Sequence, residues 1–268
     1  MADGPFDDSG ADVLSKMVRR TLPHAGIDVG RFVGAVKGMP RFVRDYRRYR
    51  EMLIADGQPV PPFDELFPIL GDRGDESGSA RGHYFHQDLW AARRVYDTRP
   101  ALHHDIGSRI DGFIAAVSVF QPVTVIDVRP LHTTIPNLSF IRSDATRLDL
   151  ADASVASIST LHAIEHFGLG RYGDPIDPDA WRRAIAELVR VAAPGGRVYF
   201  STPIGRERTM FNAHRVFAPQ TIVDAFDGLE LVSFGAVDDA GDLMTDPDLR
   251  DFGHADYSCG LFEFTRLR

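Results

Sequence analysis

Short apolar runs alternate with amphipathic segments from about residue 101 to the end of the chain. The runs are rich in β-branched side chains and predict buried strands at 101–106, 123–128, 138–142, 155–160 and 197–202. Apolar positions at helical spacing predict helices at 111–120, 179–192 and 219–226, and two further runs predict closing strands at 229–237 and 258–265. Strands that alternate with helices in this way form a mostly parallel sheet with right-handed crossovers. The pattern therefore predicts an α/β domain of Rossmann-like type.

The first 98 residues follow a different pattern. Residues 1–12 are polar, which predicts disorder, and helical spacing then extends over about 13–53, with predicted breaks at Pro23, Gly38 and Pro40. Arginines give this segment a basic face that is either solvated or rests on a membrane or an acidic partner. A loop over 55–82 and a short helix over 83–96 follow. We interpret residues 1–98 as a helical extension that caps the main domain, residues 99–268.

Composition narrows the classes of protein. The net charge of −8 at pH 7 disfavours nucleic-acid binding, which needs a basic surface. No apolar run reaches the roughly 20 residues of a membrane span, and the N-terminal sequence lacks the features of a signal peptide. Cys259 is the single cysteine, so no disulfide can form within the chain. We expect a cytoplasmic protein that acts on a small molecule or an oligosaccharide.

A glycine turn, DIGSRIDG at 105–112, follows the first predicted strand. Glycine lets the backbone approach a ligand, and the helix that follows offers free N–H groups. Asp127 ends the next strand about 20 residues later, the usual position of a carboxylate that binds a ribose diol. Asp144 repeats the arrangement after the third strand, although each aspartate alone could be a helix cap. The expected cofactor site comprises Asp105, Gly107, Ser108, Arg109, Asp127, Val128, Asp144, Ala145 and Leu161.

These features resemble the class I S-adenosylmethionine-dependent methyltransferases over residues 101–268. The glycine turn, Asp127, Asp144 and the Pro194-Gly195-Gly196 turn before the fifth strand follow that family's order of motifs, although Ser108-Arg109 replaces its further glycines. The resemblance implies a mostly parallel, seven-stranded class I methyltransferase sheet and S-adenosylmethionine as cofactor. The sequences HYFHQDLW, HDIGSRIDGF, LHAIEHFGLGRYGDP and FNAHRVF are also similar to motifs of an uncharacterised methyltransferase-like family of bacterial polysaccharide gene clusters.

Three titratable side chains follow the fourth strand. His162, Glu165 and His166 stand where open α/β sheets bind their ligands, just beyond the carboxyl end of a strand. We interpret them as catalytic, with His166 or Glu165 as a general base. At least one of His103 and His104, which lie within the first strand, is expected to be a core histidine.

The same residues also resemble metal ligands. His-x-x-Glu-His is the inverted zincin motif, but that motif lies within a long helix, whereas this one ends a strand. Some metal-dependent sugar-hydroxyl methyltransferases carry Glu-x-x-Glu-His here and a later histidine, which His162, Glu165, His166 and His214 resemble, with His162 in place of the first glutamate. That resemblance implies a divalent ion (Mg, Mn or Zn) that binds two hydroxyls and acidifies one. Metal binding and metal-free base catalysis stay open as alternatives.

The sequence thus predicts an S-adenosylmethionine-dependent O-methyltransferase (EC 2.1.1) that acts on a sugar or glycan hydroxyl. The segments 171–174 and 212–214 are expected to meet the substrate through Arg171, Tyr172, Asp174, Asn212 and His214. The alternatives are a nicotinamide-dependent sugar oxidoreductase, since such enzymes share the glycine turn and the first aspartate, and a non-catalytic cofactor-binding module of a polysaccharide assembly. The density of titratable groups around His162 favours an enzyme.

Overall fold

The computed structural model describes residues 29–71, 73 and 76–267, and the chain divides into two compact units, Met1–Gly78 and Ser79–Arg268. The described part of the first unit contains a long helix, α2 (Val29–Ala55), and a short 3-10 turn, η2 (Phe63–Glu65). The predicted breaks at Gly38 and Pro40 are wrong, because α2 is continuous through both. A single proline removes one backbone hydrogen bond, and the other bonds of a long helix hold it together. The predictions for residues 1–12 and Pro23 lie outside the described residues.

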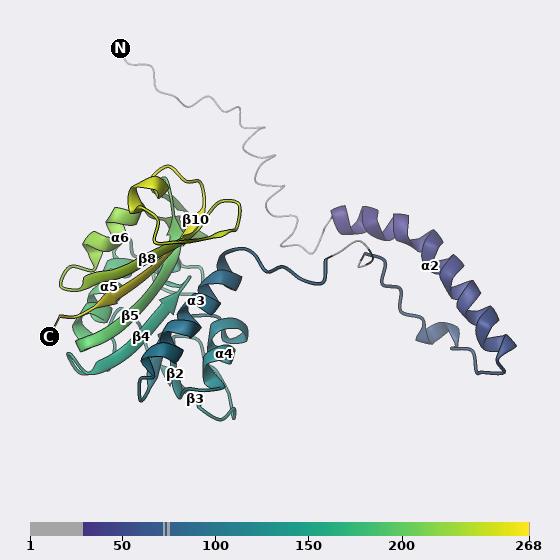
Figure 1. The fold of residues 1–268 in the computed structure, drawn as a ribbon, viewed down its shortest axis with the longest axis horizontal. Helices are drawn as coiled ribbons and strands as arrows, with labels where there is room; N and C mark the ends of the chain where they lie inside the picture. The colour runs from purple at the N-terminus through teal and green to yellow at the C-terminus, as the bar shows by residue number, and fades with distance from the viewer. Residues whose placement is uncertain (1–28, 72, 74–75, 268) are drawn as a thin grey trace, which may run out of the picture. The chain divides into compact units, whose positions relative to one another are not determined.

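The second unit is built on a mostly parallel sheet, as predicted (Figure 1). Among the described residues the sheet has eight strands in the order β3-β2-β1-β4-β5-β10-β8-β9. Their bounds are β1 His103–Ile106, β2 Val123–Asp127, β3 Leu138–Arg142, β4 Val155–Leu161, β5 Ala192–Ile204, β8 Glu230–Val237, β9 Leu243–Thr245 and β10 Ser258–Thr265. Strands β1 to β5 are parallel, whereas β10 runs antiparallel between β5 and β8. The strand beyond the seven predicted is β9, which is too short to give a periodic signal and pairs with the edge of β8.

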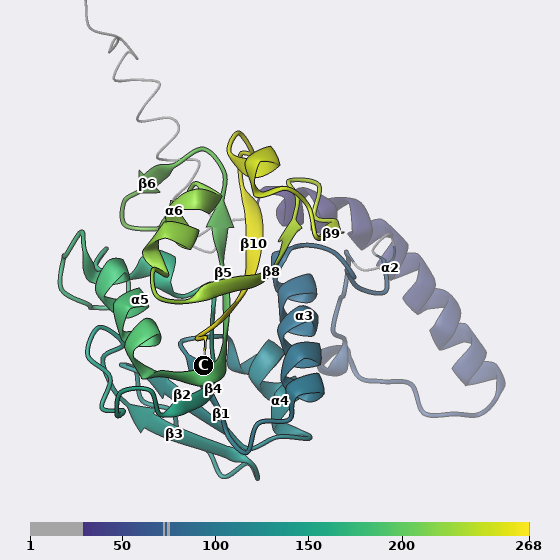
Figure 2. The ribbon, with the colours of Figure 1, turned by 60° about the vertical axis from the view of Figure 1, so that its left-hand side comes forward.

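Helices cover both faces of the sheet (Figure 2). One face carries α3 (His83–Thr98), the π-helical turn η4 (Ile110–Ile114) and α4 (Ala115–Ser118), which bury Trp90, Val95 and Phe113. The other face carries α5 (Ala180–Val191) and α6 (Pro219–Ala225), which contribute Trp181 and Ile222 to a second core. The domain is therefore a three-layer α/β/α sandwich.

The remaining elements lie in the loops. They are the 3-10 turns η5 (Ile164–His166) and η6 (Leu249–Phe252), and a two-stranded hairpin, β6 (Arg208–Met210) and β7 (His214–Val216). Within the described residues no helix combines the length and the apolar character that a bilayer span requires.

The sequence-based boundary at residue 98 differs from the division in the structure. Helix α3, which we assigned to the extension, lies in the second unit because Trp90, Ala91 and Val95 are buried in the core of that unit. The division therefore falls between residues 78 and 79, ahead of this helix.

His103 confirms the predicted core histidine. It is fully buried in β1, and its ring nitrogens lie 2.7 Å from Ser157 Oγ and 2.9 Å from Ser159 Oγ. Ser159 Oγ donates to Asp105, so it accepts from His103 Nε2. In a neutral imidazole with Nε2 protonated, Nδ1 accepts from Ser157 Oγ. Burial and the neighbouring His104 lower the pKa of His103 to about 3.

Replacing His103 by glutamine should flatten the pH dependence of stability on the acid side. In the unfolded chain His103 binds a proton below about pH 6.5, whereas in the folded protein it does so only near pH 3. The unfolded state therefore binds more protons in this interval, and the free energy of unfolding falls as the pH falls. The slope due to this group approaches about 1.4 kcal/mol per pH unit between the two pKa values and is about half of that at pH 6.5.

Urea unfolding of both proteins at several pH values between about 5 and 7 measures the two slopes. The raised pKa of Asp105 (about 6) contributes in both proteins, so the comparison isolates His103. Equal slopes would show that His103 is not held neutral by the fold.

Candidate active site

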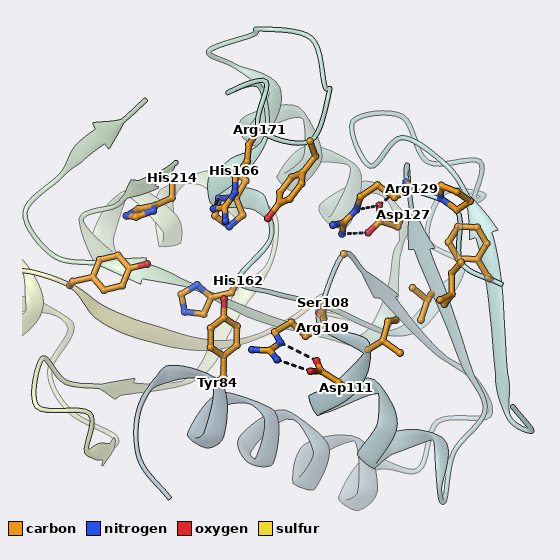
Figure 3. A pocket seen from close by; sticks show the side chains of 18 residues that line it. Tyr84, Ser108, Arg109, Asp111, Asp127, Arg129, His162, His166, Arg171 and His214 are labelled. Carbon is orange, nitrogen blue, oxygen red and sulfur yellow. Dashed lines mark hydrogen bonds and ion pairs between the residues drawn. The ribbon is translucent and has the colours of Figure 1, made fainter. Parts of the chain in front are cut away.

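Two adjacent cavities, which share several lining residues, lie at the carboxyl edge of the parallel strands. The larger, of about 720 Å³, is lined by α3 and by the segments that follow β1, β2 and β4; the smaller, of about 480 Å³, covers the ends of β2 and β3. In the larger cavity His166, His214 and Arg171 lie on one side, Tyr84 and Arg109 lie opposite, and His162 lies between them (Figure 3). The residues that line both cavities are Gly107, Asp127, Arg129, Pro130, His162, His166 and Tyr172.

The turn after β1 is held by the buried carboxylate of Asp105. It accepts hydrogen bonds from Ser108 N at 3.0 Å, Ser108 Oγ at 2.6 Å and Ser159 Oγ at 2.5 Å. Ser108 Oγ accepts in turn from the backbone N–H of Leu161 at 3.0 Å. These bonds join the glycine turn to the end of β4, so that the two loops that border the cavities are fixed relative to each other.

The predicted cofactor residues fall into two groups. Gly107 has a φ of +69°, and a Cβ there would lie 3.1 Å from Ala163 Cβ, so glycine is required where the turn passes closest to the cavities. Asp105 and Leu161 line neither cavity, since both are buried beneath the turn. The others line one cavity or both: Gly107, Ser108, Arg109, Asp127, Val128, Asp144 and Ala145.

The two strand-end aspartates have different partners. Asp127 accepts from Arg129 through the backbone N at 2.8 Å, Nε at 3.0 Å and Nη2 at 2.6 Å. The Arg129 guanidinium lies 4.6 Å from the centre of the Tyr172 ring, which places it between the cavities. Asp144 Oδ1 accepts from N and Oγ1 of Thr146, which is an Asx turn and not the helix cap that we considered as an alternative, because no helix follows Asp144 before β4 in the described chain.

His162, Glu165 and His166 are brought together at the turn into η5. His162 Nδ1 lies 2.7 Å and His166 Nε2 lies 3.7 Å from the same oxygen, Glu165 Oε1. Glu165 is fully buried and its Oε2 has no hydrogen-bond partner. His162 has a φ of +52°, a conformation that costs a residue other than glycine about 1–2 kcal/mol. Such strain clusters at functional sites.

The charges of this group follow from its burial and contacts. Burial opposes a charge on His162, but the Cys259 sulfur and the Glu165 carboxylate outweigh it and raise the pKa of His162 well above its ordinary value. Burial alone would raise the pKa of Glu165, yet its contacts with His162 lower it. Burial lowers the pKa of His166, and the attraction of Glu165 offsets only part of this. His162 and Glu165 thus form a buried ion pair beside a neutral His166.

His166 has a fixed tautomer. Its Nδ1 lies 2.6 Å from the carbonyl oxygen of Ala213, which can only accept, so Nδ1 carries the proton. Nε2 therefore carries the free lone pair. Arg171 Nη1 donates to the same carbonyl at 3.1 Å and adds a positive charge at this side of the cavity. A neutral imidazole with a free lone pair at a cavity wall can accept a proton.

The predicted substrate residues are not all at the cavities. Arg171, Tyr172 and His214 line the larger cavity, and Asp174 lines the smaller one. The Asp174 carboxylate accepts backbone bonds from residues 168, 170 and 172, so it closes its own loop. Asn212 is exposed between β6 and β7 and lines neither cavity.

The four predicted metal ligands do not form one coordination group. In the part of the chain that the structure describes, the one set of three His, Cys, Asp or Glu ligand atoms within 4.8 Å of one another comes from His83, His162 and Cys259. His214 Nε2 is buried without a hydrogen-bond partner, and its ring centre lies 6.3 Å from that of His166. Of the predicted ligands, only His162 belongs to the set that the fold assembles.

Sequence reasoning missed several residues of the site. Tyr84 and Tyr257 line the larger cavity, Arg129 pairs with Asp127, and His83 and Cys259 contact His162. The signal for Cys259 was topological, since an antiparallel closing strand begins at the edge where the parallel strands end. No periodic pattern marks Tyr257, which precedes β10 in a loop.

Sequence comparison relates part of the chain to a known family. A family described as Caenorhabditis protein of unknown function, DUF268, matches residues 144–246, a segment that contains the His162 turn and His214. No curated protein matches the chain significantly by sequence.

Solved structures resemble the chain more widely. The 4+2 cyclase SpnF has a TM-score of 0.51 at 14% identity, over 71% of this chain and 86% of its own. The N-methyltransferase NodS from Bradyrhizobium japonicum, in complex with S-adenosylhomocysteine, has a TM-score of 0.47 at 17% identity, over 70% and 89%. A Burkholderia thailandensis 1,6-didemethyltoxoflavin N1-methyltransferase has 0.48 at 15%, over 69% and 84%. At this identity the likeness to SpnF supports the Rossmann-like fold alone, and the chemistry has to be argued from the site.

Proposed function

We propose that the protein transfers a methyl group from S-adenosylmethionine to a hydroxyl group of a sugar or glycan. The observation that carries this proposal is the pair of adjacent cavities. The smaller cavity is lined by Gly107, by Asp127 at the end of β2 and by Asp144 after β3, which suit a nucleoside. His166 lines both cavities. An acceptor in the larger cavity would face both a donor bound along the strand ends and a neutral base.

The donor side rests on Gly107 and the two strand-end aspartates. The backbone at Gly107 has no side chain, so the amino-acid part of the donor can approach it closely. Asp127 keeps its carboxylate oriented through Arg129, and its oxygens can accept further bonds from a ribose diol. Asp144, Ala145 and Val128 border the smaller cavity, where an adenine ring fits. The resemblance to class I methyltransferases supports the same placement.

The acceptor side rests on His166. Its Nε2 takes the hydroxyl proton, while Nδ1–H stays bonded to the Ala213 carbonyl and fixes the ring. Glu165 Oε1, at 3.7 Å, stabilises the imidazolium that forms. When bound, S-adenosylmethionine would supply an electrophilic methyl carbon to the acceptor oxygen that His166 deprotonates, with S-adenosylhomocysteine as the leaving group. The proton remains on His166 until solvent removes it.

The walls of the larger cavity support a polar acceptor. Tyr84, Tyr172 and Tyr257 offer aromatic faces with hydroxyl tips, and Arg109 and Arg171 offer cationic groups. Rings that alternate with hydrogen-bonding groups suit a carbohydrate, which has apolar and hydroxylated faces. The similarity to a family of polysaccharide gene clusters points to the same class.

A metal-assisted form of the reaction needs His214 as a ligand together with His162, Glu165 and His166. The dispersed donor atoms favour the metal-free form, in which His166 alone removes the proton. Two other functions compete: a nicotinamide-dependent sugar oxidoreductase and a non-catalytic cofactor-binding module. The neutral His166 beside the cavity favours a catalytic role over the module.

Calorimetry with S-adenosylhomocysteine and with NAD should show binding of the first alone. Asp127→Asn should weaken S-adenosylhomocysteine binding by about 1–3 kcal/mol, because a carboxylate partner of the ribose hydroxyls is lost. Asp149→Asn, an exposed aspartate outside both cavities, is the matched control and should bind as the wild type does. Binding of NAD instead would support the oxidoreductase, and unchanged affinity in Asp127→Asn would remove Asp127 from the cofactor site.

His166→Ala should lower the rate of methyl transfer by about 100-fold or more, with S-adenosylhomocysteine affinity unchanged. Transfer of labelled methyl from S-adenosylmethionine to a panel of free and nucleotide-linked monosaccharides gives the rate. Because burial lowers the pKa of His166 below its ordinary 6.5, the neutral base is present at pH 7. The rate should therefore fall only as the pH drops through that lowered pKa.

His214→Ala separates the two forms of the mechanism. The metal-free form predicts a small effect of this change and full activity in excess chelator. The metal-assisted form predicts that His214→Ala and chelator each cost as much as His166→Ala. A His166→Ala protein that keeps the wild-type rate on every acceptor of the panel would contradict both.

A further inference from the structure

We propose that His83, His162 and Cys259 form a zinc-binding site. The three residues come from separate elements: His83 begins α3, His162 follows β4 and Cys259 lies at the start of β10. One ligand atom of each lies within 4.8 Å of the other two. This set differs from the ligands that the sequence motif suggested, and it does not depend on the methyl transfer proposed above.

The two histidines face each other as ligands of one ion do. His83 Nδ1 and His162 Nε2 are 3.2 Å apart, while the ring centres are 5.2 Å apart, so each nitrogen lies on the ring edge nearest the other ring. Zinc binds imidazole at about 2.0–2.1 Å in tetrahedral geometry, which separates two such nitrogens by about 3.3 Å. The observed spacing of the two nitrogens matches that of two ligands on a shared ion.

Glu165 prepares His162 for this role. Its Oε1 accepts from His162 Nδ1 at 2.7 Å, so Nδ1 carries a proton and the Nε2 edge faces His83 and Cys259. A carboxylate that holds the second nitrogen of a histidine ligand is the usual outer partner of zinc-bound imidazole. The Glu165 side chain is fully buried, and its other oxygen, Oε2, is unpartnered.

The charges of the site balance with zinc bound. Without a metal the His162 imidazolium compensates Glu165, but a zinc ligand must be a neutral imidazole. With zinc bound, Glu165 and a Cys259 thiolate place two negative charges among fully buried atoms, and buried charges need compensation. Among the described residues, the ion-pair contacts of Glu165 are with His162 and His166, and none is with an arginine. A divalent cation at this point neutralises both negative groups, and its binding displaces the thiol proton of Cys259 and the Nε2 proton of His162.

The donor set selects the metal. One thiolate and two imidazoles suit zinc, whereas magnesium and calcium prefer oxygen ligands. Three protein ligands leave a fourth position, and His162 lines the larger cavity, so water or a ligand there can complete the shell. Bound zinc would also tie the first residue of α3 to the sheet.

Zinc content of the full-length protein tests the site. After loading with zinc chloride and desalting, elemental analysis should find about one zinc per chain in the wild type. Cys259→Ser and His83→Gln should each lower the zinc content about tenfold or more at the same loading. His86→Gln, a histidine on the same helix that is not in the ligand set, is the matched control and should keep the wild-type content.

A second measurement reads the thiolate directly. Cobalt substituted for zinc should give a thiolate-to-metal charge-transfer band in the wild type and in His86→Gln, and the band should be missing in Cys259→Ser. Circular dichroism of each variant shows whether it is folded, and if Cys259→Ser fails to fold, His83→Gln carries the test. Two outcomes would overturn the proposal: a wild type that retains no zinc after loading and desalting, or a folded His83→Gln variant with as much zinc as the wild type. His83 Nδ1 and His162 Nε2 would then only share a proton.

Discussion

The hydrogen bonds of the buried Asp105 carboxylate hold together the edge of the sheet that carries the two cavities. This carboxylate joins the glycine turn to β4 through Ser108 and Ser159, and Ser159 in turn holds His103 in the core. A buried carboxylate without partners would cost several kcal/mol, so these hydrogen bonds stabilise the turn after β1 in its observed position. The backbone of the Gly107 turn and the turn at His162 are therefore positioned by one set of bonds rather than by separate loops.

The turn at His162 brings two histidines to the same carboxylate oxygen of Glu165. Its left-handed backbone turns the chain sharply after β4, so that His162 and His166 reach Glu165 from the two sides of one short segment. The two histidines then differ in character: His162 is engaged at both nitrogens, whereas His166 is fixed by a carbonyl and keeps one nitrogen open. His162 and His166 therefore differ in their hydrogen bonding although they are only four residues apart.

The sequence predicted the strands of the sheet well, because buried parallel strands give local signals. Strands β3 and β10 begin and end at the predicted residues. The prediction failed where contacts between residues far apart in the sequence determine the structure. The apolar stripe of α3 is compatible with either unit, α2 passes through Pro40, and Cys259 reaches His162 only because β10 runs antiparallel to β5. The ion pair between Arg129 and Asp127 could not be predicted either, because it depends on the side-chain rotamer of Arg129.

The position of β10 affects how the domain can be made on the ribosome. This strand is inserted between β5 and β8, although it follows both in the chain. Strands β8 and β9 therefore emerge before the neighbour that joins them to the rest of the sheet. During synthesis β5 exposes an unpaired edge until β10 appears, and such edges pair readily with other chains. The order of synthesis thus leaves a period in which nascent chains are vulnerable to aggregation, and closure of the sheet and completion of the residues around His162 come in the same late step.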